Sequence, residues 1–215
     1  MRYLLMGWVC LAAVVAAAAP EFTSHDIQVG QKTFALPVPK ELQWVARDTP
    51  WAKERIETGE HLAKDPRMNV TFVMVMIKPA QYAEAAKAGR LDSSFSCWAC
   101  VPTPRLEKQY DVAQFHDLMD SVAGQLDSFG GVASQMKDDR LRKIVEGFSK
   151  VALLDRTDRS LQTMTRNGHL LVASTYVLVE GKALILFMQR PKEEARELMA
   201  DMDAWVAEIL KQTKP

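Results

Sequence analysis

The sequence predicts an α+β fold: a twisted antiparallel sheet with helices packed on its faces, in the arrangement called an α/β/α sandwich. Two observations predict this class. Strand-like runs separated by turn residues crowd the last third of the chain, and segments with helical spacing of apolar residues precede and follow them. The composition, 48% hydrophobic and 25% charged over 215 residues, is that of a globular chain with one sizeable core. With no internal repeat or linker, residues 20–215 are expected to form a single domain.

Residues 1–19 have the pattern of a secretory signal peptide. Arg2 precedes an unbroken apolar run, and Ala17 and Ala19 occupy the small-residue positions of a cleavage site. We expect cleavage after Ala19 and a periplasmic or secreted mature chain without a membrane span, because the run is short for a bilayer and nothing basic follows it directly. Lys plus Arg and Asp plus Glu number 27 each, so no net charge favours nucleic acid as a partner.

The first half of the mature chain is predicted to hold a hairpin, two helices and a buried strand. Gly30 provides the hairpin turn, and Pro50 favours the start of a short helix. Pro79 ends a strand with apolar residues on both faces and begins the next helix, which Gly89 closes. The expected ranges are a hairpin over 27–39, a helix within 49–65, a strand over 69–79 and a helix over 80–89.

The second half is predicted to contain helices on either side of an antiparallel meander. The pairs Asn167-Gly168 and Glu180-Gly181 separate strand-like runs, as tight hairpin turns require. Leu198, Met202 and Trp205 lie on one face of a final helix. The expected ranges are helices over 110–130 and 138–148, strands near 150–156, 160–168, 170–179 and 183–189, and a helix over 191–213.

The segment "TRNGHLLVASTYVLVEGKALILFMQ", followed by a helix ending in "WVAEIL", resembles the carboxy-terminal half of the PsbP-like proteins of the bacterial envelope. The earlier "FALPVP" and "TFVMVMIKP" are compatible with the same sandwich. The resemblance implies a twisted antiparallel sheet flanked by helices, and small accessory or binding proteins in an exported compartment. It does not extend to the cysteine-bearing segment.

A predicted long loop over 89–105 carries the motif "CWAC", with Cys97, Trp98 and Cys100. Loss of Cys10 with the signal peptide leaves two cysteines, an even number in an oxidising compartment. The favoured interpretation is therefore a structural disulfide that shapes the loop, with Trp98 packed beneath it. A thiol redox site stays open, although the prolines that follow work against the helix such a site needs. A zinc half-site is the third alternative, but it has no matching second pair of ligands.

No other pattern in the sequence indicates chemistry. There is no metalloprotease, nucleophile-elbow or phosphate-loop motif, so we expect no catalytic residue, no metal and no cofactor. Met74 and Met76 fall within an apolar strand and are interpreted as core residues. His116 and Asp120, four residues apart on a predicted helix, are interpreted as a solvated polar edge.

These observations favour an exported, non-catalytic binding or accessory protein of the bacterial envelope. Its partner is expected to be a protein or small molecule of that compartment. Two alternatives remain: a thiol–disulfide redox protein using the "CWAC" segment, and an immunity or inhibitor protein that binds a secreted enzyme.

Overall fold

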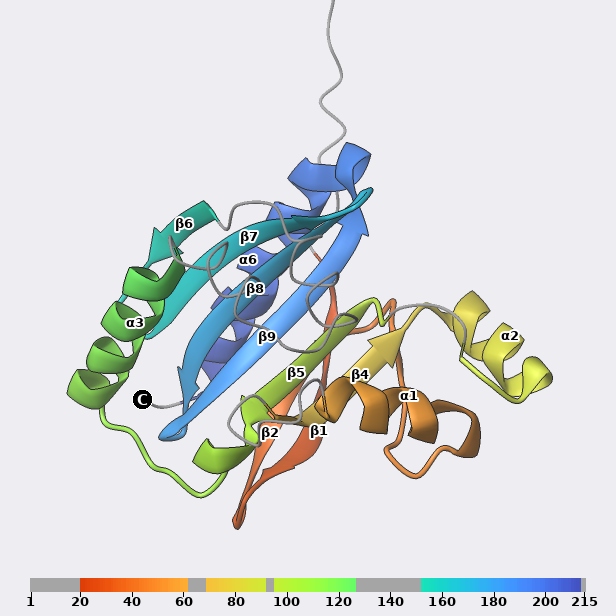
Figure 1. The fold of residues 1–215 in the computed structure, drawn as a ribbon, viewed down its shortest axis with the longest axis horizontal. Helices are drawn as coiled ribbons and strands as arrows, with labels where there is room; N and C mark the ends of the chain where they lie inside the picture. The colour runs from red at the N-terminus through yellow and green to blue at the C-terminus, as the bar shows by residue number, and fades with distance from the viewer. Residues whose placement is uncertain (1–19, 62–68, 92–94, 127–151, 214–215) are drawn as a thin grey trace, which may run out of the picture.

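The structure is a computed structural model that describes residues 20–61, 69–91, 95–126 and 152–213. The predicted signal peptide and the helix predicted over 138–148 lie outside the described residues. A seven-stranded antiparallel sheet forms the centre of the fold, in the strand order β3-β4-β5-β9-β8-β7-β6 (Figure 1). Its strands are β3 (Gln43–Trp44), β4 (Val70–Ile77), β5 (Cys97–Pro102), β6 (Ala152–Arg156), β7 (Ser160–Asn167), β8 (Leu170–Val179) and β9 (Lys182–Pro191).

The predicted fold class is confirmed, because helices pack on this mainly antiparallel sheet. The meander β7-β8-β9 follows from its turns. Gly168 has φ 61° in the first turn, and in the second Glu180 and Gly181 have φ 51° and 77°. Backbone with positive φ matches the twist of the flanking strands, so these short turns set the register of both hairpins.

One face of the sheet, called here the α6 face, is covered by helix α6 (Ala195–Gln212) and by a separate hairpin of β1 (Phe22–Val29) and β2 (Lys32–Pro39). The predicted stripe of α6 is buried there, and Trp205 is fully enclosed. Met74 and Met76 contribute to the same core, as the sequence predicts. None of the helices in the described ranges is long and apolar enough to cross a bilayer.

The other face, called here the α3 face, carries helices at its two ends. Helices α1 (Pro50–Glu60) and α2 (Pro79–Ala88) pack near β4, and α3 (Val112–Leu126) packs on β8 and its neighbours (Figure 1). The burial of Phe115 and Met119 explains the position of α3, because both apolar side chains are fully removed from water.

The end of α1 is joined to a bulge in β4. The carboxylate of buried Glu60 accepts a 2.8 Å hydrogen bond from the backbone N–H of Phe72, where the register between β4 and β5 shifts. A second hydrogen bond, 2.6 Å long, comes from Nη2 of Arg47. The carboxylate thus satisfies backbone freed by the bulge. Gly59 allows this close approach, since a Cβ there would lie 2.6 Å from Cε2 of Phe72.

The prediction of a loop over 89–105 is wrong for residues 97–102. Residues 97–102 form β5, which pairs with β4 on one side and with β9 on the other. Pro102 stands at the last position of the strand and Pro104 within the short 3₁₀ turn Thr103–Arg105, where neither interrupts the hydrogen-bonded ladder. The two prolines therefore mark the end of a central strand.

Candidate functional site

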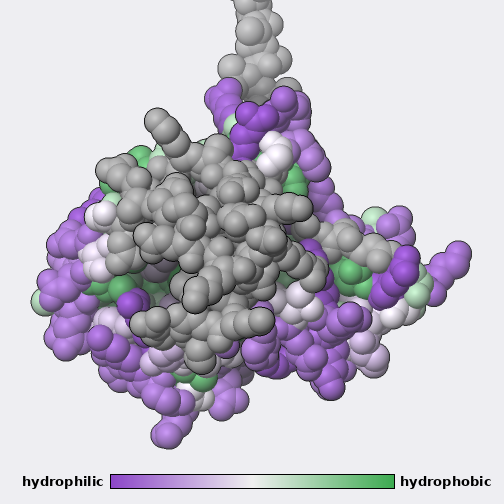
Figure 2. All heavy atoms as spheres, in the orientation of Figure 1, coloured by the Kyte–Doolittle hydropathy of each residue, from purple (hydrophilic) through white to green (hydrophobic). Residues whose placement is uncertain are grey.

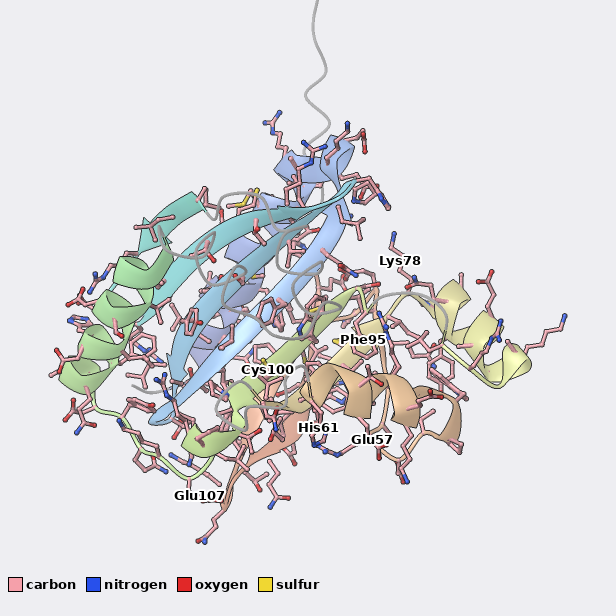
Figure 3. All side chains as sticks on the ribbon, in the orientation of Figure 1. Glu57, His61, Lys78, Phe95, Cys100 and Glu107 are labelled. Carbon is pink, nitrogen blue, oxygen red and sulfur yellow. The ribbon has the colours of Figure 1, made fainter. Side chains whose placement is uncertain are left out.

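The "CWAC" residues alternate across the sheet. Cys97 lies opposite Met188 and faces the core beneath α6, whereas Cys100 lies opposite Ile185 on the α3 face, together with Trp98. Figure 3 shows Cys100 on β5, in the middle of the sheet. Both cysteines are buried and free, so the favoured disulfide is not present in this structure.

Strand geometry explains why the two sulfurs do not meet. Three steps of about 3.3 Å separate the Cα atoms of Cys97 and Cys100 by about 10 Å. A disulfide needs Cα atoms within about 7 Å and side chains that converge. An odd number of steps along a strand directs the side chains to opposite faces, so a bond would require β5 to unfold locally.

The thiols are also held in their neutral form. Burial raises the pKa of Cys97 well above its ordinary value, with a smaller contribution from the charge of Glu41. Burial, and then the charge of Glu60, raise the pKa of Cys100 to about 12. Attack on a disulfide requires a thiolate. The surroundings of both cysteines therefore disfavour the redox alternative. Within the described ranges, no three metal-binding side chains come together.

Trp98 belongs to a row of aromatic side chains on the α3 face. Its ring stacks on Phe187 with centroids 5.0 Å apart and planes 10° from parallel, and Phe95 contacts it edge-on at 6.3 Å. Phe95 contacts Phe72 in turn. This packing indicates a structural role for Trp98, joining β5 to β9.

Two hollows on the described surface are considered as binding sites. The larger, about 380 Å³, lies beside α1, where Arg47, Lys53 and Glu57 are among the lining residues. Its cations already have partners: Arg47 contacts Glu60 at 2.6 Å, and Lys53 lies 4.0 Å from Glu57. Internal neutralisation of this kind is typical of a solvated surface.

The second hollow, about 260 Å³, lies between the segment 103–111 and α3 and is called here the α3 cleft. Its floor includes buried Tyr110 and Leu118, and its mouth is polar, in keeping with the mostly hydrophilic left edge of Figure 2, where α3 lies. The lining residues are Arg105, Lys108, Tyr110, Gln114, Asp117, Leu118 and Ser121.

The first wall of the α3 cleft is fixed by the β8–β9 turn. The ammonium of Lys182, a side chain only 2% exposed, donates a 2.8 Å hydrogen bond to the carbonyl of Leu106. The backbone N–H of Tyr110 donates at 2.8 Å to Gly181. The two attachments, at Leu106 and Tyr110, hold the segment that follows the 3₁₀ turn. Arg105, at the end of that turn, and Lys108, between the attachments, therefore project from a defined backbone.

The β1–β2 turn supports the same segment. A Cβ at Gly30 would lie 2.6 Å from a carboxylate oxygen of Glu107, so this glycine lets the side chain pack against the turn. Lys32, the first residue of β2, donates to the backbone carbonyl of Glu180. Glu107 is labelled at the lower end of the molecule in Figure 3. Two hairpins and the segment 103–111 thus meet at one corner.

The second wall is the exposed side of α3. Reciprocal hydrogen bonds begin this helix: Gln114 N–H donates to the carboxylate of Asp111 at 2.7 Å, and Asp111 N–H donates to the Gln114 amide oxygen at 3.2 Å. This capping box fixes the first turn. Gln114, Asp117 and Ser121 follow at helical spacing and face the cleft, while Phe115 anchors the opposite side.

The electrostatics of the α3 cleft differ from those of the first hollow. Within the described part of the chain, neither Arg105 nor Lys108 has a carboxylate oxygen within 4.0 Å. The ammonium of Lys108 lies 4.6 Å from the ring centroid of Tyr110. Tyr110 is 6% exposed, and its buried hydroxyl has no hydrogen-bond partner. Burial raises the pKa of Tyr110, and the charge of Arg105 opposes that rise only in part.

The sequence-based predictions missed this cleft. Arg105 and Lys108 stand three residues apart in "RLEKQY", just before a tyrosine and an Asp-x-x-Gln helix start. That local pattern was the available signal. The local pattern does not reveal the hydrogen bond between Lys182 and Leu106, because these residues are 76 positions apart in the sequence.

Comparison with protein-family models, with curated proteins and with solved structures gives no significant match to this chain. The PsbP-like resemblance therefore stays a prediction.

Proposed function

We propose that this chain is an exported, non-catalytic binding or accessory protein of the bacterial envelope, and that it holds a small anionic group of its ligand in the α3 cleft. One observation carries the proposal: Arg105 and Lys108, without carboxylate partners in the described ranges, line a cleft together with a buried tyrosine whose hydroxyl is unpartnered.

The hydroxyl of Tyr110 leaves hydrogen-bonding capacity unused beside the cleft. A buried hydroxyl without a partner costs about 1–3 kcal/mol relative to one that is bonded. Cations that face a concave surface with a low-dielectric floor attract anions more strongly than cations on an open surface. A carboxylate or phosphate group that enters the cleft would accept charge-assisted hydrogen bonds from Arg105 and Lys108.

Two features of the sequence support export: the pattern of residues 1–19, and the resemblance of the carboxy-terminal third to PsbP-like envelope proteins. The thiol–disulfide alternative has less support, because Cys97 and Cys100 face opposite sides of the sheet and both are buried.

Native mass spectrometry would test the proposal. The full-length chain is expressed in a bacterial host, purified gently from the envelope fraction, and compared with an Arg105→Gln/Lys108→Gln variant. A matched control is Arg196→Gln/Lys192→Gln, which removes two cations at the other end of the molecule. We expect a small-molecule adduct on the native protein and the control, reduced at least tenfold on the cleft variant.

An adduct that persists on the cleft variant, with circular dichroism unchanged, would contradict this assignment of the site. A native protein that carries no adduct, even after incubation with the low-mass fraction of envelope extract, would contradict the proposed function.

A further inference from the structure

The wall of the α3 cleft formed by α3 carries a negative charge opposite the two cations. Asp117 is exposed, lines the cleft, and has no cationic nitrogen within 4.0 Å among the described residues. The cleft therefore presents separate charges of opposite sign on its two walls, rather than an internal ion pair.

Stabilisation of helix α3 does not explain why an aspartate occupies position 117. Negative side chains stabilise a helix in its first turn, and Asp111 already provides the cap of α3, with Gln114 completing the capping box. Asp117 lies six residues beyond that cap, on the same helical face as Gln114 and Ser121. A carboxylate at this position would repel a ligand that carried only negative charge.

On the basis of the proposed function, we infer that the cleft binds a small zwitterion of the amino-acid class with an apolar side chain. Its carboxylate is placed against Arg105 and Lys108, and its ammonium against Asp117. The side chain lies over the floor of Tyr110 and Leu118, which are 6% and 9% exposed. The volume of about 260 Å³ lies just below the usual range of about 300–1,000 Å³ for ligand pockets, so the ligand is a small molecule.

Three probes of nearly the same shape test the charge requirement. L-leucine carries both charges, 4-methylpentanoate lacks the ammonium, and 3-methylbutylamine lacks the carboxylate. Binding to the full-length chain is measured by isothermal titration calorimetry. We expect leucine to bind at least tenfold more tightly than either analogue, because each analogue leaves one wall of the cleft without its counter-charge.

Two substitutions assign each charge to its wall. The Asp117→Asn variant should bind leucine no more tightly than it binds 4-methylpentanoate. Its affinity for 4-methylpentanoate should be equal to or higher than that of the native protein. Arg105→Gln should weaken the binding of leucine and of 4-methylpentanoate by the same factor. Asp203→Asn and Arg196→Gln, on exposed positions of α6, are matched controls and should leave all three affinities unchanged.

Equal affinities for leucine and 4-methylpentanoate, or an Asp117→Asn variant that keeps the native preference, would overturn the zwitterion and leave the proposed function intact. Absence of binding by all three probes would also overturn it, and the adduct experiment would then decide the proposed function independently.

Discussion

The indole N–H of Trp205 donates a buried hydrogen bond of 2.7 Å to the backbone carbonyl of Pro37. The donor belongs to α6 and the acceptor to β2, so this contact attaches the two-stranded β1–β2 sheet to the helix that covers the main sheet. Pro37 lies near the end of the hairpin predicted over 27–39, and Trp205 lies in the predicted apolar stripe of the last helix. Their contact combines two features that the sequence indicates only separately.

Trp205→Phe is expected to destabilise the protein by about 1–3 kcal/mol, because the carbonyl of Pro37 loses its buried donor and the smaller ring leaves space beside it. Urea unfolding followed by circular dichroism would measure the loss. Trp51→Phe is the control, since Trp51 is half-buried and its edge contact with Tyr82, at 4.9 Å, can persist with a phenyl ring. Equal losses in the two variants would contradict a special role for the Trp205 contact.

Two glycines in helices should respond to alanine in opposite directions. At Gly59 a methyl group would overlap the ring of Phe72, so Gly59→Ala is expected to cost about 1–3 kcal/mol despite alanine's better helix propensity. At Gly124, in α3, nothing lies within 4 Å of the position of a Cβ. Gly124→Ala should therefore stabilise the protein by about 0.4–1 kcal/mol.

Thermal or urea unfolding of both variants would check this pair of expectations. The double variant Gly59→Ala/Phe72→Leu should recover part of the loss, because leucine lacks the ring atoms that the new methyl group meets. A double variant no more stable than the sum of its single changes would show that the clash with Phe72 is not the cause.

The thiols of Cys97 and Cys100 should be inert in the folded protein. We expect the intact mass of the unreduced protein to show Cys97 and Cys100 as free thiols. Iodoacetamide at pH 8 should label both cysteines in urea and neither under native conditions, because burial keeps them protonated and out of contact with the reagent. A product two hydrogens lighter before reduction would instead favour the disulfide.

The raised pKa of Cys100 has a definite consequence for stability at high pH. In the folded state this pKa is about 12, against 9.0 for an ordinary thiol. Above pH 9 the unfolded chain loses the proton while the folded chain keeps it, so the thiol's contribution to stability is complete below pH 9 and decreases as the pH rises to about 12. At pH 10 the decrease amounts to about 1.4 kcal/mol.

Lysine and tyrosine side chains also titrate in this pH range. Their contribution cancels when the unfolding free energy of the native protein is compared with that of the Cys100→Ala variant. Alanine has a constant cost from the lost sulfur, so the difference in unfolding free energy between the two proteins should shrink from pH 8 to pH 10. Curves that stay parallel across this range would show that Cys100 does not titrate between the folded and unfolded states as described.

The meander and its turns could be predicted because their causes are local. Asn167-Gly168 supplies the backbone freedom of one hairpin turn, and the stripe that includes Trp205 specifies the buried side of α6. The position of β5 could not be predicted in this way. Its only local signals were the two prolines near its end, and its place at the centre of the sheet depends on pairing with β9.

The α3 cleft depends even more on long-range contacts. Arg105 and Asp117 lie in segments that local patterns describe as a loop and a polar helix face. They line one cleft because the carbonyl of Leu106 accepts a hydrogen bond from Lys182 and the N–H of Tyr110 donates to Gly181. A buried lysine whose partner is a distant backbone carbonyl leaves no periodicity in the sequence.

The pairing of β5 with β9 also sets an order of events during synthesis. β3, β4 and β5 form one antiparallel run near the amino terminus, and β6 to β9 form another, so each can fold through contacts close in sequence. Until β9 is synthesised, however, β5 is an edge strand. Its apolar side chains are then exposed, and the backbone groups that pair with β9 have no hydrogen-bond partners. A nascent or truncated chain that ends before β9 should therefore aggregate through this edge.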